Sequence, residues 1–371
     1  MSSSSSSSVS NKCNEESDGL GHITNDVIET LASQLENVPL GNNKFNEDGN
    51  LAPSLAHDGS PIASPDQTDD LETRQDLDQV ITHWVYFSCH ELKWEAFNPN
   101  SKEWMNLPII MGDICFQLSD KESIAVGTEL LVLGKCLSGH AVYKYNLLTN
   151  SWSEGQLMNK PRCLFGSASL GNIAIFAGGV SRSGKMVNEV EAYDSETGAW
   201  EMLPSLLKPR GMSSGVFMDG KFYVIGGCSG PDMKPLSCGE EYDLVAKQWK
   251  VIPDMSPGGG GGSMAPPLLA VVDNELYAAD YTTMEVKKYD KTLNVWECIG
   301  LLPKRAANVS GWGIAFKGCG DRVIIVAGPR AYGNTHVEIY AWAPKEGPPQ
   351  WSMLGRKKAN NFVYNCAVMS R

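Results

Sequence analysis

The chain has 371 residues, of which 42% are hydrophobic, so it can bury a large core. Its net charge is −12, and residues 1–82 hold the whole excess, with 15 acidic and 3 basic residues, whereas residues 83–371 hold 28 of each. Because binding to nucleic acid or to an anionic membrane needs a basic face, we expect neither partner.

The ten cysteines include no Cys-x-x-Cys pair, and the six histidines show no metal-ligand spacing. We therefore expect no disulfide framework, no metal and no cofactor. The N-terminus lacks a basic start followed by an apolar run, and no apolar stretch reaches the length of a membrane span. These features predict a protein of the nucleus, the cytoplasm or both.

Residues 1–82 read as a largely disordered acidic tail. The tail opens with a serine run and is rich in Asn, Asp, Gly, Ser and Pro, a composition that buries too little apolar area to offset the entropy of ordering. Within it, residues 23–40 have the pattern of a short helix, with Asp26 as the cap. One face of that helix would carry Val27, Ile28, Leu31 and Leu35.

From His83 onward, one phrase recurs: an aromatic residue, then Asn or Asp, five variable residues and a Trp. Its copies are Phe97-Asn98 to Trp104, Tyr145-Asn146 to Trp152, Tyr193-Asp194 to Trp200, Tyr242-Asp243 to Trp249 and Tyr289-Asp290 to Trp296. A sixth Trp follows at 351. A repeat of nearly 50 residues is typical of a four-stranded propeller blade of the kelch kind. The repeated tryptophans are expected to pack in the core.

The two chain ends are predicted to share a blade. The first unit, Trp84 to Leu107, has room for three strands, and Phe362 to Met369 forms a strand without a unit of its own. Pairing them removes the exposed edges of an open stack of sheets. The fold predicted for residues 83–371 is therefore an all-β, six-bladed kelch propeller, closed by the strand 362–369.

The repeat domain resembles the plant F-box/kelch-repeat proteins over almost all of residues 83–371. The resemblance rests on the glycine pairs Gly178-Gly179 and Gly226-Gly227, the Tyr-Asp and spaced Trp, and four longer strings. The strings are His83 to Phe87, Cys163 to Gly171, Ser214 to Gly227 and Phe362 to Met369. The resemblance implies a non-catalytic substrate-recognition subunit of an SCF-type (Skp–cullin–F-box) ubiquitin ligase.

In that family an F-box ahead of the propeller binds the Skp adaptor. Residues 23–40 resemble the opening of an F-box, and the implied adaptor-binding residues are Asp26, Val27, Ile28, Leu31 and Leu35. The Pro that usually precedes the acidic residue is absent, and residues 41–70 read as disordered. The alternative is a kelch interaction protein that lacks ligase docking and antagonises intact relatives.

One face of the ring is expected to bind the target protein, because it collects the loop between the second and third strands of each blade and the loop into the next blade. The second set repeats a basic residue in Pro161-Arg162, Pro209-Arg210, Lys304-Arg305 and Arg356-Lys357. Guanidinium groups suit carboxylates or phosphates. The candidate partner-binding residues are Arg162, Arg210, Arg305, Arg356, His140, Arg182, Lys185, Lys234, Arg330, Tyr332 and His336. An equally weighted alternative is that the Pro-Arg pairs stabilise turns.

Overall fold

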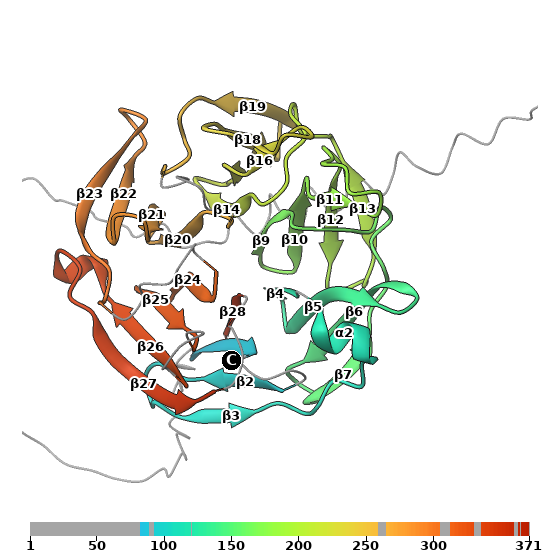
Figure 1. Cartoon of the computed structure of the whole chain (residues 1–371), viewed down its shortest axis with the longest axis horizontal. Helices are drawn as coiled ribbons and strands as arrows, with labels where there is room; N and C mark the ends of the chain where they lie inside the picture. Colours follow the sequence, from blue (N-terminus) through green and yellow to red (C-terminus); the bar gives the residue numbers. More distant parts are fainter. Residues whose placement is uncertain are drawn as a thin grey trace, which may run out of the picture.

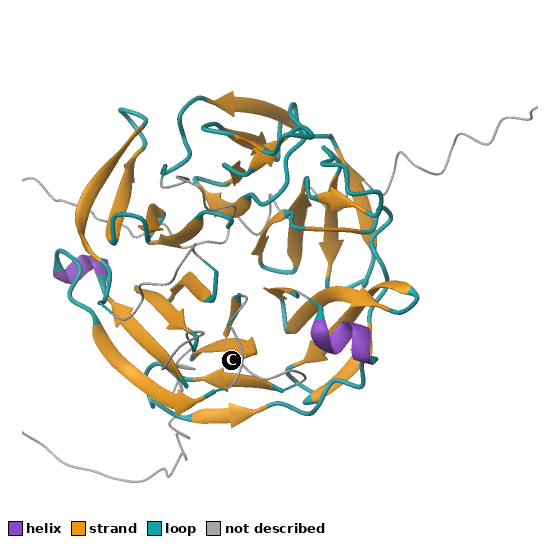
Figure 2. Ribbon diagram, in the orientation of Figure 1, coloured by secondary structure: helices purple, strands orange, loops and turns teal. Residues whose placement is uncertain are grey.

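The computed structural model describes residues 82–88, 93–119, 121–258, 265–304, 312–329, 335–359, 363 and 365–370. Six four-stranded antiparallel sheets stand in a ring around a central axis, so the predicted six-bladed propeller is confirmed (Figure 1). Two short helices, α2 (Ile114–Leu118) and η2 (Pro344–Glu346), accompany the strands of the described part (Figure 2). The predicted tail and its segment 23–40 lie outside the described residues.

The blades are numbered along the chain, and the strands of each blade run from the inner to the outer. Blade 1 is β28 (Cys366–Ser370), β1 (His83–Ser88), β2 (Trp94–Phe97) and β3 (Trp104–Asn106). Blade 2 is β4 (Glu122–Val126), β5 (Glu129–Cys136), β6 (Gly139–Asn146) and β7 (Ser151–Glu154). Blade 3 is β9 (Gly166–Leu170), β10 (Ile173–Ala177), β12 (Val190–Asp194) and β13 (Trp200–Leu203).

The second half of the ring repeats the same order. Blade 4 is β14 (Ser214–Met218), β15 (Lys221–Ile225), β18 (Gly239–Asp243) and β19 (Gln248–Ile252). Blade 5 is β20 (Leu268–Val272), β21 (Glu275–Asp280), β22 (Glu285–Asp290) and β23 (Val295–Leu301). Blade 6 is β24 (Ile314–Cys319), β25 (Arg322–Ala327), β26 (His336–Trp342) and β27 (Ser352–Lys358).

Two small ladders lie outside the blades. They pair β8 (Arg162–Cys163) with β11 (Val180–Ser181), and β16 (Cys228–Ser229) with β17 (Lys234–Pro235).

The repeated aromatic-to-Trp phrase builds the outer turn of blades 1 to 5. In blade 4, the carboxylate of Asp243 accepts hydrogen bonds from the backbone N–H groups of Val245 and Ala246, at 3.0 and 2.8 Å. Lys247 then takes a positive φ of 55°, which reverses the chain into β19. Tyr242 packs against Trp249 with ring centroids 4.8 Å apart. The phrase therefore encodes a turn and the aromatic pair that covers it.

The tryptophans also join neighbouring blades. The indole Nε1–H of Trp200 donates to the carbonyl of Gln156, at 2.8 Å, and that of Trp249 donates to the carbonyl of Pro204, at 2.7 Å. In both cases the acceptor lies in the connection that leaves the preceding blade. The buried apolar side chains form six clusters, each made by two adjacent blades. The core of the protein thus lies between the blades.

The C-terminal strand lies beside the first strand of the chain. β28 pairs with β1 from His83 opposite Ser370 to Phe87 opposite Cys366, and it supplies the inner strand of blade 1. Cys366 is almost fully buried, as are Val85 and Phe87 of β1. The ring therefore has no unpaired blade edge at the point where the two chain ends meet.

Candidate functional site

One face of the ring, which we call the loop face, carries the loop between the second and third strands of each blade and the connection to the next blade. In blade 3 these are residues 178–189 and 204–213. The opposite face carries the turns between the first and second strands and between the third and fourth. The two sets of connections alternate because each blade is an antiparallel meander.

Two arginines predicted to contact a ligand are buried. Arg162 is 3% exposed and Arg210 is 0% exposed. The Nη2 of Arg210 lies 2.6 Å from Oε1 of Glu240, and its Nη1 donates to the carbonyls of Gly226 and Cys238, at 3.0 and 3.1 Å. Both guanidinium groups therefore lie inside the protein, and not at the rim where the sequence led us to expect them.

Arg162 makes the equivalent contacts in blade 3. Its Nη1 pairs with Glu191, its Nε donates to the carbonyl of Gly178 at 2.7 Å, and its Nη2 donates to that of Phe176 at 3.0 Å. Glu191 also accepts hydrogen bonds from the backbone N–H groups of Asn159 and Lys160, at 2.7 and 3.1 Å. The ion pair thus ties the loop that enters a blade to the third strand of that blade, which supports the structural alternative for the Pro-Arg pairs.

Sequence reasoning missed the glutamates that hold these arginines. Glu191 and Glu240 lie two residues before the repeated tyrosine, and Glu95 and Glu338 hold similar places in blades 1 and 6. Glu95 pairs with Lys357. Alignment of the repeats on the aromatic residue would have revealed the series.

Blade 5 reverses the polarity of the pair. Lys287 stands two residues before Tyr289, and its Nζ lies 2.7 Å from Oδ2 of Asp280, which ends β21. Burial tends to raise the pKa of Asp280, but the hydrogen bond and charge of Lys287 and the backbone N–H groups of Thr282 and Thr283 together outweigh burial, so the pKa lies below its usual value.

Blade 2 has an aromatic pair where blades 3 and 4 have an ion pair. Tyr143 stands two residues before Tyr145, and Phe116 of α2 packs on it. The helix is held by Asp113, whose carboxylate accepts hydrogen bonds from the backbone N–H of Phe116 and of Leu137, both at 2.8 Å. These bonds, that of Leu137 first, lower the pKa of Asp113.

The remaining predicted residues divide into three groups. Arg356 is 44% exposed, and its Nε lies 3.2 Å from Oε1 of Glu338. His336 is the first residue of β26, the same strand that carries Glu338. Lys185 and Lys234 are exposed on the loop face. Arg305, Arg330, Tyr332, Asp26, Val27, Ile28, Leu31 and Leu35 lie outside the described residues.

His140 and Arg182 come together from adjacent blades. The Nε–H of Arg182 donates to Nδ1 of His140 at 3.3 Å, so the neutral ring carries its proton on Nε2. Burial, Arg182 and Lys135, in that order, lower the pKa of His140. The ring is therefore neutral at neutral pH.

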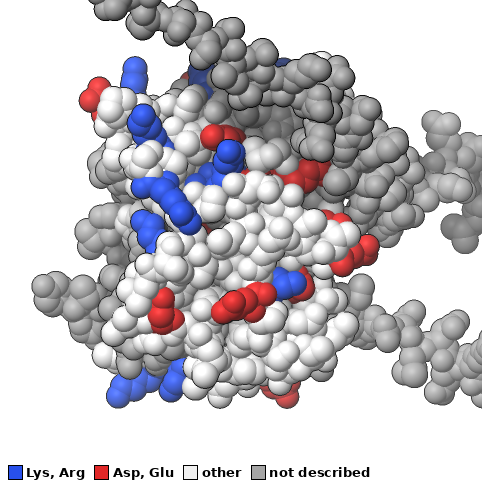
Figure 3. Space-filling view, turned by 90° about the vertical axis from the view of Figure 1, so that its right-hand side faces the viewer, with Lys and Arg blue, Asp and Glu red and all other residues white. Residues whose placement is uncertain are grey.

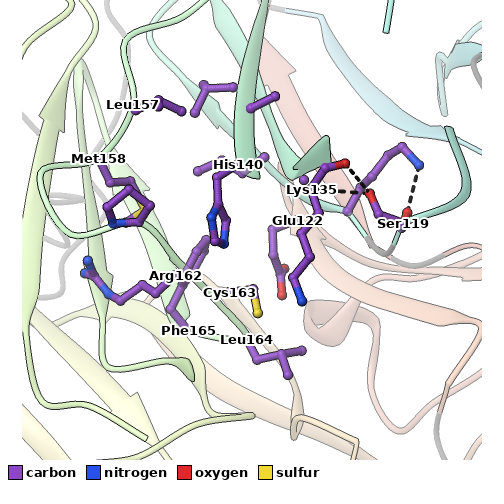
Figure 4. Close-up of a pocket in the computed structure, with 16 residues that line it drawn as sticks. Ser119, Glu122, Lys135, His140, Leu157, Met158, Arg162, Cys163, Leu164 and Phe165 are labelled. Atoms are coloured by element: carbon purple, nitrogen blue, oxygen red, sulfur yellow. Dashed lines mark hydrogen bonds between the residues drawn. The ribbon is translucent and has the colours of Figure 1, made fainter. Parts of the chain in front are cut away.

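A cavity of about 360 Å³ opens between blades 2 and 3 beside these residues (Figure 4). His140 projects into its centre, and Leu157, Met158 and Phe165 stand around it in the close-up. A second cavity, of about 290 Å³, lies between blades 4 and 5. The first is the better candidate for binding because apolar atoms make up a larger share of its lining.

In the described part of the chain, His, Cys, Asp and Glu side chains do not gather in a group of three or more that could hold a metal ion. Nor does any helix there have the length and apolar composition to cross a membrane.

The Kelch motif family model matches residues 161–207 and 209–256. The chain is 52% identical to F-box/kelch-repeat protein At1g26930 of Arabidopsis thaliana over 79% of its own length and 72% of the relative. It is 56% identical to F-box/kelch-repeat protein SKIP11 of the same plant, over 78% of the chain and 64% of the relative. F-box/kelch-repeat protein At1g74510, also from Arabidopsis thaliana, is 53% identical over 78% of the chain and 68% of the relative.

Proposed function

Because the chain belongs to the F-box/kelch-repeat family of plant proteins, we propose that it is the substrate-recognition subunit of an SCF-type ubiquitin ligase. The propeller binds the target protein on the loop face, and residues 23–40 bind the Skp adaptor that joins the cullin. The subunit acts as a non-catalytic receptor, in the nucleus, the cytoplasm or both. Other subunits of the ligase carry out the transfer of ubiquitin.

The observation that carries this proposal is the place where the chain enters the ring. β1 runs from His83 toward the connection 89–93, which belongs to the loop face. His83, paired with Ser370, therefore lies at the opposite face. Thr82, the first described residue, joins His83 at that face, so the proposal assigns the face opposite the loop face to the ligase and the loop face to the target.

Copurification from plant cells with the proteasome inhibited tests the adaptor role. The full chain should recover Skp and cullin, and the double variant Ile28→Asp/Leu31→Asp should lose both, because a charged face cannot pack on the adaptor. The matched control Leu51→Asp/Leu55→Asp alters the same tail outside 23–40 and should keep them. Equal recovery by the two variants contradicts the assignment of 23–40.

A second candidate function is a kelch interaction protein without ligase docking. It is favoured by the absence of Pro at positions 24 and 25, where Thr24 and Asn25 stand, and by the polar composition of residues 41–70. Such a protein would bind the targets of intact relatives and protect them. If the unaltered chain recovers target proteins without Skp, this second function replaces the first.

A further inference from the structure

The groove between blades 2 and 3 is open because the hairpin of blade 2 is unusually simple. The ladder of β5 and β6 continues to Cys136 opposite Gly139, so a two-residue turn at Leu137 and Ser138 ends it. This hairpin contributes His140 and Ala141 to the lining of the cavity, which Phe165 of the next connection also lines.

The next gap along the ring is filled by a different loop. In blade 3 the loop folds back, with Val180 bridged to Met186, and both side chains approach Gly211 of the connection to blade 4. A methyl group on Gly211 would lie 3.1 Å from Cγ2 of Val180. Cys163 holds the place of Gly211 in the preceding connection and lines the open cavity instead.

The interior of the groove suits an uncharged, bulky side chain. Its walls include Leu133, Val142, Leu157, Met158 and Phe165. His140 is neutral at neutral pH, Glu191 matches the charge of Arg162, and the ammonium of Lys121 donates to the carbonyls of Gln117 and Ser119. At about 360 Å³ the cavity lies near the lower end of small-ligand sites, roughly 300–1,000 Å³, so it can take one or two side chains.

The mouth of the groove is basic. The three bordering segments, 134–141, 156–165 and 178–188, contain no Asp or Glu. Besides the buried Arg162, they carry four exposed basic side chains: Lys135, Lys160, Arg182 and Lys185. Figure 3 views the side of the ring that holds these blades and shows Lys and Arg side chains gathered along one edge. Among the described lining residues the one acid is Glu122, on the inner strand β4.

We propose that this groove binds an acidic segment of the target protein, with one bulky apolar side chain in the cavity. Carboxylates on either side of that residue pair with Lys135, Lys160, Arg182 and Lys185. A nucleic acid would use the basic mouth but leave the apolar cavity empty, so a peptide fits both features. This inference rests on the proposed receptor function and names the chemistry of its target.

Fluorescence anisotropy with the purified full chain tests the groove. The probe is a labelled heptapeptide with Phe at its centre and Asp or Glu at all the remaining positions. Comparison peptides carry Ala at the centre, phosphoserine in place of the acids, or Lys in their place, and an oligonucleotide of equal charge is the last probe. We expect the Phe peptide to bind at least tenfold more tightly than the Ala and Lys peptides. Tighter binding of the phosphoserine peptide than of the carboxylate peptide would overturn the choice of carboxylates.

Two variants address the two features separately. Leu157→Trp enlarges a side chain that is 40% exposed and fills the cavity with it. This variant should bind the Phe peptide about tenfold more weakly, and its affinity for the Ala peptide should change by less than twofold. Arg182→Glu/Lys185→Glu should weaken both peptides about tenfold. The control Lys208→Glu/Lys234→Glu reverses two exposed basic residues of the loop face outside the groove, and should change neither by more than twofold.

The proposal is overturned if the Phe and Ala peptides bind equally, if the control weakens binding as much as the groove variant, or if the oligonucleotide binds more tightly than the Phe peptide. Thermal unfolding of each variant confirms that it is folded. Copurification of Skp from the same preparations separates the two hypotheses, since loss of peptide binding with Skp retained refutes the groove and leaves the receptor function standing.

Discussion

Phe116 and Tyr143 meet edge to face in blade 2, with ring centroids 4.7 Å apart, at the place where blades 3 and 4 join an arginine to a glutamate. The aromatic pair gives the same tie between an entering loop and a third strand through ring packing instead of an ion pair. Because Phe116 sits on a short helix, the rim of blade 2 differs from the rims of blades 3 and 4. Met111, Ile114 and Leu137 are exposed there, at 88%, 65% and 76%.

Removal of the Phe116 ring should destabilise the propeller. The side chain is 0% exposed, so Phe116→Ala leaves a cavity that costs about 3–5 kcal/mol in the free energy of unfolding, measured by denaturant titration. The neighbouring control Ile114→Ala changes a side chain that is 65% exposed and should cost less than about 0.5 kcal/mol. A cost for Phe116→Ala as small as that expected for Ile114→Ala would mean that the Phe116 ring contributes nothing to the stability of the blade.

Loss of Arg210 should act on stability in the same way. Arg210→Ala leaves Glu240 buried without its ion pair, which costs about 3–5 kcal/mol in the free energy of unfolding. Lys208→Ala, two residues away on the exposed surface, is the control and should be near neutral. If Arg210→Ala keeps the stability of the parent but no longer binds the target, Arg210 takes part in target binding.

Asp280 should add to the free energy of unfolding at neutral pH and lose this contribution in acid. Its pKa is lower in the folded protein than the usual 3.8, so its contribution is present above pH 3.8 and is lost as the pH falls through the folded value. Asp280→Asn should therefore unfold more easily than the parent at pH 7, with a difference that shrinks below pH 3.8. Urea titrations at several pH values measure it. The control Asp321→Asn changes a side chain that is 65% exposed and should have the same free energy of unfolding as the parent at each pH. If the loss of stability caused by Asp280→Asn grows toward acidic pH, the argument is wrong.

Deletion of residues 360–371 should abolish cooperative unfolding. The truncation removes β28, the inner strand of blade 1, and uncovers β1, whose Val85 and Phe87 are fully buried. Differential scanning calorimetry should show no sharp transition, whereas deletion of residue 371 alone should leave one. A sharp transition in the longer truncation would show that the ring does not need its closing strand.

The fold could be predicted because its repeated signals act over short distances. Asp243 binds backbone groups two and three residues ahead, and Tyr242 packs on Trp249 across one turn, so each copy of the phrase reports its own blade. The burial of Arg162 and Arg210 could not be read from a Pro-Arg pair, because their glutamates lie 29 and 30 residues away. The groove depends on which loop folds over which gap, and composition does not reveal that.

The pairing of β28 with β1 places the first and last strands of the repeat domain in one blade. At about 5–20 residues per second, synthesis of the stretch from Ser88 to Cys366 takes roughly 14–56 s, and only then is the second partner of β1 available. Until then, the edge of β1 that β28 covers has no partner strand. The ring can close only after β28 has been made, so the chain exposes an unpaired strand edge, which favours aggregation, until that point.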